Sequence, residues 1–326
     1  MSKFRQIMAV VLAAGMLSAP VSAQEEQAVR VTALKGPTAM GLVKMMDEAG
    51  YGTDEAAGYQ FEIAAAPDVV APLLAKGETD IAAVPANLAS VLYNNTKGGV
   101  RVIAINTLGV LYIVDTSGSV SSVSDLKGRT IYASGKGSTP EYALNYILSG
   151  NGIDPDADVQ IEWKSEHAEC LAALLEDPEG IAMLPQPFVT TAMMKDDSIQ
   201  VVLDLSEEWD KLQEGSENPS GMITGVAVVR TAFAEENPEA VTAFLEAYAD
   251  SVAYVNEDTA GAAALVGAYD IVPQAVAEKA LPACNITLIT GQEMADKLAG
   301  YLQVLFDANP ESVGGALPEE DFFFIP

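Results

Sequence analysis

The stretch TIYASGKGSTPEYALNYIL contains a loop whose residue types could bind an anion. A predicted strand ends before Lys136-Gly137-Ser138-Thr139 and a predicted helix follows it. An ammonium group, two hydroxyls and free backbone N–H groups are therefore gathered in one place. A nucleotide-binding P-loop would need a glycine five positions before its Gly-Lys pair, and Ser or Thr directly after the lysine. Thr130 and Gly137 occupy those positions, so the loop is not a P-loop.

A second loop of the same kind, Lys35-Gly36-Pro37-Thr38, lies 101 residues earlier. Each loop is followed by a related segment, IAAVP at 81–85 and IAMLP at 181–185, which are 100 residues apart. Few residues are identical. Their order and constant spacing nevertheless indicate that residues 29–106 and 129–204 are two copies of one structural unit.

Each copy alternates predicted strands with predicted helices in the same order. The strands are expected at residues 29–33, 60–64, 80–84 and 101–106, and again at 130–133, 159–164, 180–184 and 200–205. The helices are expected at 38–50, 68–76 and 87–94, and again at 139–150, 166–176 and 188–195, with Thr38 and Ser138 or Thr139 as caps. This pattern predicts an α/β fold with two Rossmann-like lobes, each a mostly parallel sheet with helices on both faces.

The chain is expected to cross between the lobes twice, through residues 106–115 (NTLGVLYIVD) and 221–230 (GMITGVAVVR). Both segments are predicted to be extended, which indicates a two-strand hinge near residues 107–115 and 221–229. Lobe I would then comprise residues 28–108 and 226–326, and lobe II residues 109–225. Helices that start at Asn237 and cover 274–281 and 292–306 are expected to pack on lobe I. The tail DFFFIP is expected to dock in the core.

Both Lys-Gly-x-Thr loops are predicted to lie at the carboxyl ends of parallel strands, where ligands of such sheets bind. Asn87 and Gln186 follow the third strand of each copy and add amide side chains that could bind polar groups. Either loop alone could be a plain strand-to-helix turn with a solvated lysine. Two matched loops across one cleft favour a binding site.

The chain has 326 residues, of which 49% are hydrophobic, and a formal net charge of -29 at pH 7. This length and apolar share predict a folded protein of two domains. The strong negative charge argues against nucleic acid and anionic membranes as partners, because both would be repelled.

The first 23 residues have the three regions of a secretory signal peptide. Lys3 and Arg5 form the basic region, residues 7–17 are apolar, and Val21-Ser22-Ala23 precedes a polar segment. We expect cleavage after Ala23 and a periplasmic or secreted protein. The alternative is an N-terminal membrane anchor, which is disfavoured because the apolar run is short for a membrane span.

Two cysteines and one histidine limit the available chemistry. Cys170 and Cys284 are expected to be buried free thiols in different lobes, with a disulfide as the alternative in an oxidising compartment. His167 and Cys170 lie three positions apart on a predicted helix and could share a metal. A structural site needs four ligands, however, and the sequence has no second Cys/His pair. We therefore expect no metal, no cofactor and no catalytic residue.

The chain beyond residue 23 resembles the substrate-binding proteins of ABC importers of the nitrate/sulfonate/taurine (NitT/TauT) type. The resembling segments are LKGPTAMGLVKMMDEAG, GETDIAAVPANLASVLYN, INTLGVLYIV, SDLKGRTIYASGKGSTPEYALNYIL, GIAMLPQPFVTTAM and LSEEWDKL. The resemblance implies the type II periplasmic binding protein fold. It also implies capture of a small molecule by lobe closure and delivery to a membrane permease with a cytoplasmic ATPase. We expect the protein to be a monomer.

The resemblance also implies which residues face the ligand. They are Gly36, Pro37, Thr38, Ala86, Asn87, Thr107, Leu108 and Gly109 in lobe I, and Gly137, Ser138, Thr139, Gln186 and Thr224 in lobe II, with Glu166 and His167 at the rim. Lys35 and Lys136 join this set from the two loops. Gram-positive members of the family usually carry a lipid-modified cysteine at the cleavage site. Pro20 stands at that position, so we do not expect lipid tethering.

Two rival functions and two ligand classes stay open. Related folds host synthesis of the thiamine pyrimidine with histidine and clustered cysteines, and the lack of such a cluster argues against an enzyme. A solute-sensing module without transport is the second rival. The lysines and helix N-termini favour an oxyanion such as a sulfonate, nitrate or carboxylate. Neither loop contains the arginine that usually binds one, so a thiamine-pyrimidine-like or other aromatic metabolite is the alternative.

Overall fold

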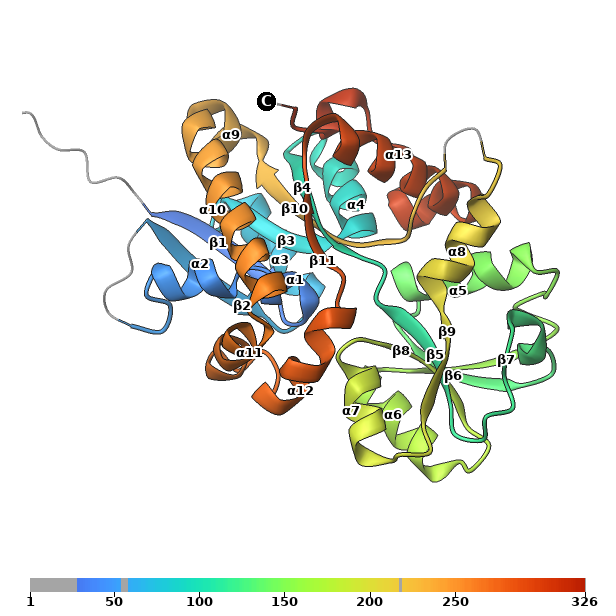
Figure 1. Ribbon diagram of the computed structural model, residues 1–326. Helices are drawn as coiled ribbons and strands as arrows, with labels where there is room; N and C mark the ends of the chain where they lie inside the picture. Colours follow the sequence, from blue (N-terminus) through green and yellow to red (C-terminus); the bar gives the residue numbers. More distant parts are fainter. Residues whose placement is uncertain (1–27, 54–57, 217–218, 326) are drawn as a thin grey trace, which may run out of the picture.

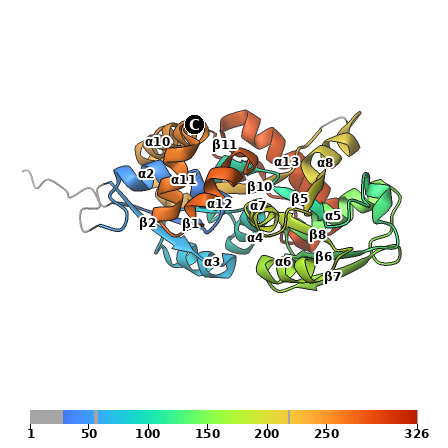
Figure 2. The ribbon, with the colours of Figure 1, turned by 60° about the horizontal axis from the view of Figure 1, so that its bottom comes forward.

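Two β-sheets, each flanked by helices, make up the protein (Figure 1). The computed structural model describes residues 28–53, 58–216 and 219–325. The predicted signal peptide, residues 1–23, lies outside the described residues. In Figure 1 and in the turned view of Figure 2, the green middle of the chain lies in one half of the molecule. The blue and orange segments form the other half.

The first half contains a six-stranded sheet with the order β11-β4-β10-β3-β1-β2. Its strands are β1 (Val29–Leu34), β2 (Tyr59–Ala64), β3 (Ile81–Pro85), β4 (Val100–Leu108), β10 (Ile223–Arg230) and β11 (Ile286–Ile289). Its helices are α1 (Pro37–Met40), α2 (Val43–Glu48), α3 (Pro67–Lys76), α4 (Ala86–Thr96), α9 (Thr231–Glu236), α10 (Pro238–Glu257), α11 (Thr259–Ala268), α12 (Gln274–Ala280) and α13 (Gly291–Ala308).

The second half contains a five-stranded sheet with the order β7-β6-β8-β5-β9. Its strands are β5 (Leu111–Asp115), β6 (Thr130–Ser134), β7 (Gln160–Lys164), β8 (Ile181–Pro185) and β9 (Gln200–Asp204). Its helices are α5 (Thr139–Gly150), α6 (His167–Glu176), α7 (Phe188–Lys195) and α8 (Leu205–Gln213).

The two sheets share one topology. β1 pairs in parallel with β2 and β3, as β6 does with β7 and β8. The next place in each sheet is taken by an antiparallel strand that enters from the other half. These strands are β10, between β3 and β4, and β5, between β8 and β9. The arrangement confirms the predicted α/β fold of two lobes, with mixed sheets instead of purely parallel ones.

Apolar packing continues from one half into the other. One buried cluster includes Val102 of the first sheet and Ile131 of the second. α13 links them, because the ring centroid of Tyr301 lies 5.4 Å from that of Trp209 on α8. A second cluster lies between the first sheet and helices α2, α10 and α11. α10 packs on α2, as predicted, whereas α13 contacts both halves of the molecule.

The helix predicted over residues 38–50 is divided into α1 and α2, so the prediction of one continuous helix was wrong. Gly41 lies at the break in close contact with the rest of the fold. A Cβ atom at this glycine would lie 3.1 Å from Ile286 and 3.4 Å from the ring of Tyr248. The Gly41 carbonyl accepts a hydrogen bond of 2.8 Å from Ser251 Oγ on α10. Tertiary packing against α10 therefore replaces the regular helix.

The sequence pattern did not predict α8, α9, α11 or β11. α11 has the sequence TAGAAALVGA, whose small and apolar residues show no helical period, and β11 spans only four residues. Across the described ranges, no helix combines the length and the apolar character that a membrane crossing requires. The C-terminal tail docks in the core as predicted, because Phe322 is fully buried and Phe323 pairs with Val102.

Candidate functional site

The carboxyl ends of the parallel strands of the two sheets meet at one junction. Asn87, at the start of α4 after β3, accepts a hydrogen bond of 3.1 Å at Oδ1 from Thr139 Oγ1 at the start of α5. The Asn87 amide also donates to the carbonyl of Ser312 at 3.2 Å. Both Asn87 and Thr139 are buried. Two residues that the sequence assigned to opposite sides of a cleft are therefore in direct contact.

The loop at residues 35–38 directs its polar groups inward. Thr38 Oγ1 donates to the carbonyl of Leu34 at 2.8 Å, so it is not the helix cap that we predicted. The Thr38 methyl group lies next to Gly225, beside Asn106 and Thr107. Thr107 Oγ1 in turn donates to Asn106 Oδ1 at 3.1 Å. This loop thus closes over the end of β4.

Lys35, which was expected to face an anion, is exposed instead. Its ammonium nitrogen lies 3.4 Å from a carboxylate oxygen of Asp270, and both side chains are largely exposed. Such a pair contributes little to stability. Gly36 next to it has a φ of 128°, a value that favours glycine, while Pro37 begins α1.

The polar groups of the loop at residues 136–139 form hydrogen bonds with neighbouring residues of the chain. The backbone N–H of Gly137 donates to Glu141 Oε2 at 2.5 Å, and Ser138 Oγ donates to the carbonyl of Gly135 at 2.7 Å. Ser138 occupies the N-cap position but makes no capping hydrogen bond, contrary to the prediction. The N–H of Gly137, which was expected to bind an anion, is therefore occupied by a carboxylate. Lys136 is exposed.

The remaining predicted residues lie along the same junction with different partners. Gln186 Oε1 accepts hydrogen bonds from the N–H of Thr190 at 3.3 Å and from its hydroxyl at 2.8 Å. The Leu108 N–H donates to the carbonyl of Asn285 at 3.1 Å, and the Gly109 carbonyl accepts from Asn285 Nδ2. Ala86 is buried at the start of α4.

His167 lies at the start of α6, next to the exposed Glu166. Its Nδ1 lies 2.5 Å from Ser134 Oγ, and its ring centroid lies 5.1 Å from that of Phe188. Burial lowers the pKa of His167 to about 4, so the ring is neutral at pH 7. Among the described residues, no three His, Cys, Asp or Glu side chains are grouped so that they could hold a metal ion. Cys170 and Cys284 are buried and not paired with each other.

Buried polar atoms without partners gather at the junction. Seven side-chain atoms of the described residues are buried and lack a hydrogen bond, and five of these belong to Asn106, Ser206, Thr224, Tyr248 and Tyr301. Burial raises the pKa of both tyrosines, so both hydroxyls stay protonated. The Tyr248 hydroxyl lies close enough to Asn106, and the Tyr301 hydroxyl to Thr139, for each contact to lower the pKa of the tyrosine, although neither pair meets the geometry of a hydrogen bond. Unpaired buried groups are costly and commonly mark a functional site.

Sequence reasoning named Thr224 but missed Asn106, Ser206, Tyr248 and Tyr301. Asn106 is a buried amide that directly follows the apolar run at residues 102–105 of β4, a signal that could have identified it. Tyr248 and Tyr301 lie on the apolar faces of α10 and α13, where the sequence pattern predicts that an aromatic residue belongs to the core. Only the fold brings these two hydroxyls to the strand ends.

Two mixed sheets that exchange a strand, with strand ends joined at a polar junction, define the two-lobed class of periplasmic binding proteins. In fold, the chain is similar to an ABC transporter from Parabacteroides distasonis, with 23% identity, a TM-score of 0.75 and coverage of 91% of this chain and 98% of that one. The periplasmic aliphatic sulphonate-binding protein SsuA from Escherichia coli shows 17% identity, a TM-score of 0.72 and 92% coverage of each chain. The periplasmic nitrate-binding protein NrtA from Synechocystis PCC 6803 shows 12% identity, a TM-score of 0.61 and coverage of 89% and 84%.

The chain belongs to the family of ABC transporter periplasmic substrate-binding proteins for phosphonate, whose model matches residues 42–273. No curated protein matches its sequence. The family match confirms the resemblance to ABC substrate-binding proteins, and the similar folds of the sulphonate-binding and nitrate-binding proteins are consistent with the nitrate/sulfonate/taurine type. Membership places the protein outside the cytoplasm, with a small-molecule ligand and a membrane permease as partners.

Proposed function

We propose that the protein captures a small oxyanion with a single negative charge, such as a sulfonate, nitrate or carboxylate, at the junction. It then delivers the solute to a permease that is driven by a cytoplasmic ATPase. The observation that carries this proposal is the set of unpaired polar atoms of Asn106, Ser206, Thr224, Tyr248 and Tyr301. All five side chains are neutral and can donate hydrogen bonds, and an oxyanion accepts such bonds.

Charge arguments narrow the ligand class. None of the predicted ligand-facing residues is an arginine, which a doubly charged phosphonate would favour. α4 begins at the junction with no capping side chain, so its first N–H groups and positive end favour one negative charge. The sulphonate-binding and nitrate-binding proteins of similar fold support the same class.

The two sides of the junction would bind different parts of the ligand. Glu141 occupies the loop N–H of Gly137 and adds a negative charge there, so that side disfavours an anion. The anionic group would therefore lie on the side of Thr38 and Asn106. Neutral groups of the ligand would face Thr139 and Gln186. The neutral rings of His167 and Phe188 favour the alternative, an aromatic metabolite bound at this second side.

Entry of the ligand requires the junction to open. We propose that the lobes are residues 28–108 with 226–326 and residues 109–225, and that they rotate about residues 107–115 and 221–229. Opening would break the hydrogen bond between Asn87 and Thr139. Ligand capture would restore the closed state, and we propose that a monomer does this without catalysis. The predicted cleavage after Ala23 would give a secreted chain that begins at Gln24, which intact mass measurement tests.

A thermal-shift and calorimetry panel tests the ligand class on residues 24–326. The panel contains alkanesulfonates, nitrate, carboxylates, phosphonates and thiamine-pyrimidine analogues. A ligand at a hundred times its Kd should stabilise the protein by about 2.7 kcal/mol. Asn106→Asp keeps the shape of the side chain but adds a negative charge, so it should weaken the binding of an oxyanion by about a hundredfold. Asn106→Leu is the uncharged control and should weaken it less.

An increase in melting temperature caused only by an aromatic compound would overturn the proposal of an oxyanion ligand. It would still support capture of a solute. Tight oxyanion binding that Asn106→Asp leaves unchanged would place the site away from the junction. If a folded protein binds nothing in the panel or in a wider set of solutes, capture at this junction is wrong.

A further inference from the structure

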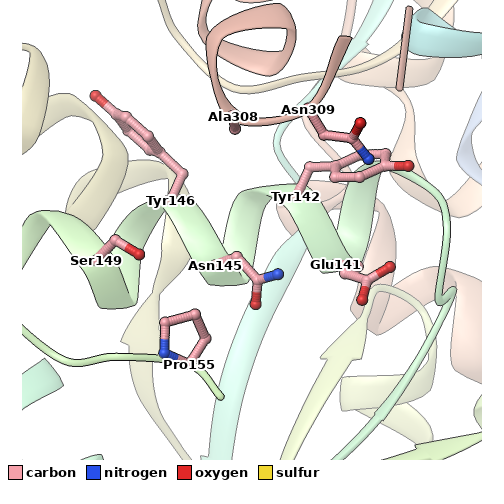
Figure 3. Close-up of a pocket in the computed structure, with 8 residues that line it drawn as sticks. All are labelled: Glu141, Tyr142, Asn145, Tyr146, Ser149, Pro155, Ala308 and Asn309. Carbon is pink, nitrogen blue, oxygen red and sulfur yellow. The ribbon is translucent and has the colours of Figure 1, made fainter. Parts of the chain in front are cut away.

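A hollow of about 500 Å³ lies between α5 and the end of α13 (Figure 3). It is lined by Glu141, Tyr142, Asn145 and Tyr146 of α5 and by Asn309, which follows α13. Tyr142 and Tyr146 also pack against the core, whereas the buried residues of α5 are Thr139, Ala143, Leu144, Ile147 and Leu148. None of the five residues with unpaired polar atoms at the junction lines the hollow.

The electrostatic character of the hollow is negative. Glu141 supplies a carboxylate, and none of the eight described residues that line the hollow is Lys, Arg or His. α13 ends at Ala308 on the rim and has no basic residue in its last turn. The negative end of this helix dipole thus adds to the carboxylate instead of being neutralised. Both features favour a cation.

One hydrogen-bond acceptor in the hollow lacks a donor. Asn145 Oδ1 is buried and makes no hydrogen bond. In Figure 3 the Asn145 amide and the Glu141 carboxylate lie on the same side of α5. A buried acceptor without a donor is costly, so a ligand that brings an N–H group here would be favoured.

Two tyrosine rings complete the walls. The Tyr146 hydroxyl accepts a hydrogen bond from Gln213 Nε2, and its ring centroid lies 4.4 Å from that of Trp209, which fixes this wall. Figure 3 shows the Tyr142 ring beneath the Asn309 side chain. Aromatic faces attract cations and cover the apolar part of a ligand.

We propose that this hollow binds a small protonated amine. The ammonium group would donate to Asn145 Oδ1 and pair with Glu141, and the rest of the amine would extend toward the Tyr142 ring. Anions are disfavoured by the carboxylate and the helix end. Quaternary ammonium ions carry the charge but have no N–H for Asn145. The hollow shares Glu141 with the second loop, because the same carboxylate holds the Gly137 N–H, but its other lining residues are not among those proposed to bind the oxyanion.

Calorimetry on residues 24–326 at low ionic strength tests the proposal, with ethanolamine, butylamine and putrescine as probes and choline as the control cation. At least one primary amine should bind with a Kd below about 1 mM, and choline should bind at least about tenfold more weakly. Glu141→Gln should weaken the amine by about tenfold or more. Its amide oxygen can still accept from Gly137, so the loop should persist.

Glu169→Gln is the matched control, because Glu169 accepts a hydrogen bond from the Ser165 N–H at 2.9 Å in the same i to i−4 arrangement on α6. It makes the same change in net charge and should leave amine binding unaltered. Asn145→Leu removes the unpaired acceptor and should weaken the amine as much as Glu141→Gln does. Thermal unfolding of each variant shows whether it is folded.

Equal binding of choline and the amines would overturn the proposal, since it would reflect general attraction to an acidic protein. Equal loss in Glu141→Gln and Glu169→Gln would do the same. So would the absence of saturable binding up to about 10 mM of each amine. Asn106→Leu should leave amine binding intact, so failure of the junction site and failure of this site are distinguishable.

Discussion

The loops at residues 35–38 and 136–139 follow equivalent strands of the two sheets, yet their polar groups make different hydrogen bonds. At the first, Thr38 bonds to Leu34 and packs against Gly225, and no side chain caps α1. At the second, the carboxylate of Glu141 holds the Gly137 N–H. The first loop therefore leaves the start of α1 without a capping side chain. In the second loop, Glu141 occupies the N–H group that could bind an anion.

The difference originates three positions after Ser138, in the first turn of the helix. Met40 is the residue that corresponds to Glu141 at the repeat interval of 101, and Met40 is fully buried in the core. An apolar side chain makes no bond with the loop, whereas a glutamate can reach back to it. Two loops of one sequence pattern thus acquire different roles through a single neighbouring residue.

The largest expected effect comes from closing the space beneath the first loop. An alanine Cβ at Gly225 would lie 2.5 Å from Asn106 Oδ1 and 2.6 Å from the Thr38 methyl group. Gly225→Ala should reduce the free energy of unfolding by about 3 kcal/mol and abolish solute binding, because the buried side chains of Asn106 and Thr38 would have to move. Chemical denaturation and calorimetry measure the two effects.

Gly137→Ala is the control in the second loop. No atom lies within 4 Å of the added carbon there, and the φ of 77° costs only backbone strain. It should cost about 1 kcal/mol and retain binding. Equal losses in the two variants would contradict the asymmetry between the loops.

The next effect depends on pH and concerns only the second half of the molecule. His167 has a folded-state pKa of about 4, below its ordinary value of 6.5, because burial disfavours its charged form. The unfolded chain therefore takes up the proton first, and stability is lost as the pH falls from 6.5 towards 4. His167→Asn should abolish about 2 kcal/mol of the difference in unfolding free energy between pH 7.5 and pH 5.

The side chains that His167 contacts directly do not titrate in that window. Ser134 and Phe188 carry no charge, and burial raises the pKa of the Cys170 thiol. Residue 66, its counterpart at the repeat interval, is an alanine. Denaturation curves at both pH values measure this difference, and an equal difference in unfolding free energy in His167→Asn and in the native chain would show that the histidine does not contribute.

The fold was predictable where local signals repeat. The order of strands and helices in residues 29–106 and 129–204 follows from periodicity and from the matched loops, and the structure confirms it. The break at Gly41 was not predictable, because it depends on the side chain of Tyr248, which lies far away in the sequence. Periodicity describes one face of a helix and contains no information about a distant close contact.

The candidate site was predictable in part for the same reason. Asn87 and Thr139 were expected at strand ends, but their mutual hydrogen bond depends on how the halves meet. Glu141 was recognised as favourable for a helix N-terminus, yet the same preference lets it occupy the Gly137 N–H. Tyr301 looked like any core aromatic residue, and only its place on α13 brings its hydroxyl to Thr139.

A smaller effect on stability and affinity is expected when the Glu141 carboxylate is removed from the second loop. Glu141→Ala frees the Gly137 N–H and removes a negative charge from the start of α5. The variant should lose about 1 kcal/mol of stability and bind the oxyanion about threefold more tightly. Glu239→Ala, in the first turn of α10, removes the same charge away from the junction and should not change affinity. Unchanged or weaker oxyanion binding in Glu141→Ala would mean that the carboxylate does not oppose the ligand.

The smallest effect concerns the two loop lysines, which share the exposed first position of the pattern. Lys35→Met breaks an exposed contact with Asp270 and should leave the unfolding midpoint unchanged, as should Lys136→Met. Their effects on the oxyanion should differ. If the anionic group binds beside the first loop, Lys35→Met should slow association by about twofold at low salt, and Lys136→Met should slow it less. Stopped-flow association at two salt concentrations measures both rates. Long-range attraction is strongest for the cation nearest the bound charge. A larger decrease of the association rate in Lys136→Met would therefore place the anion on the side of Glu141 and reverse the assignment of the two loops.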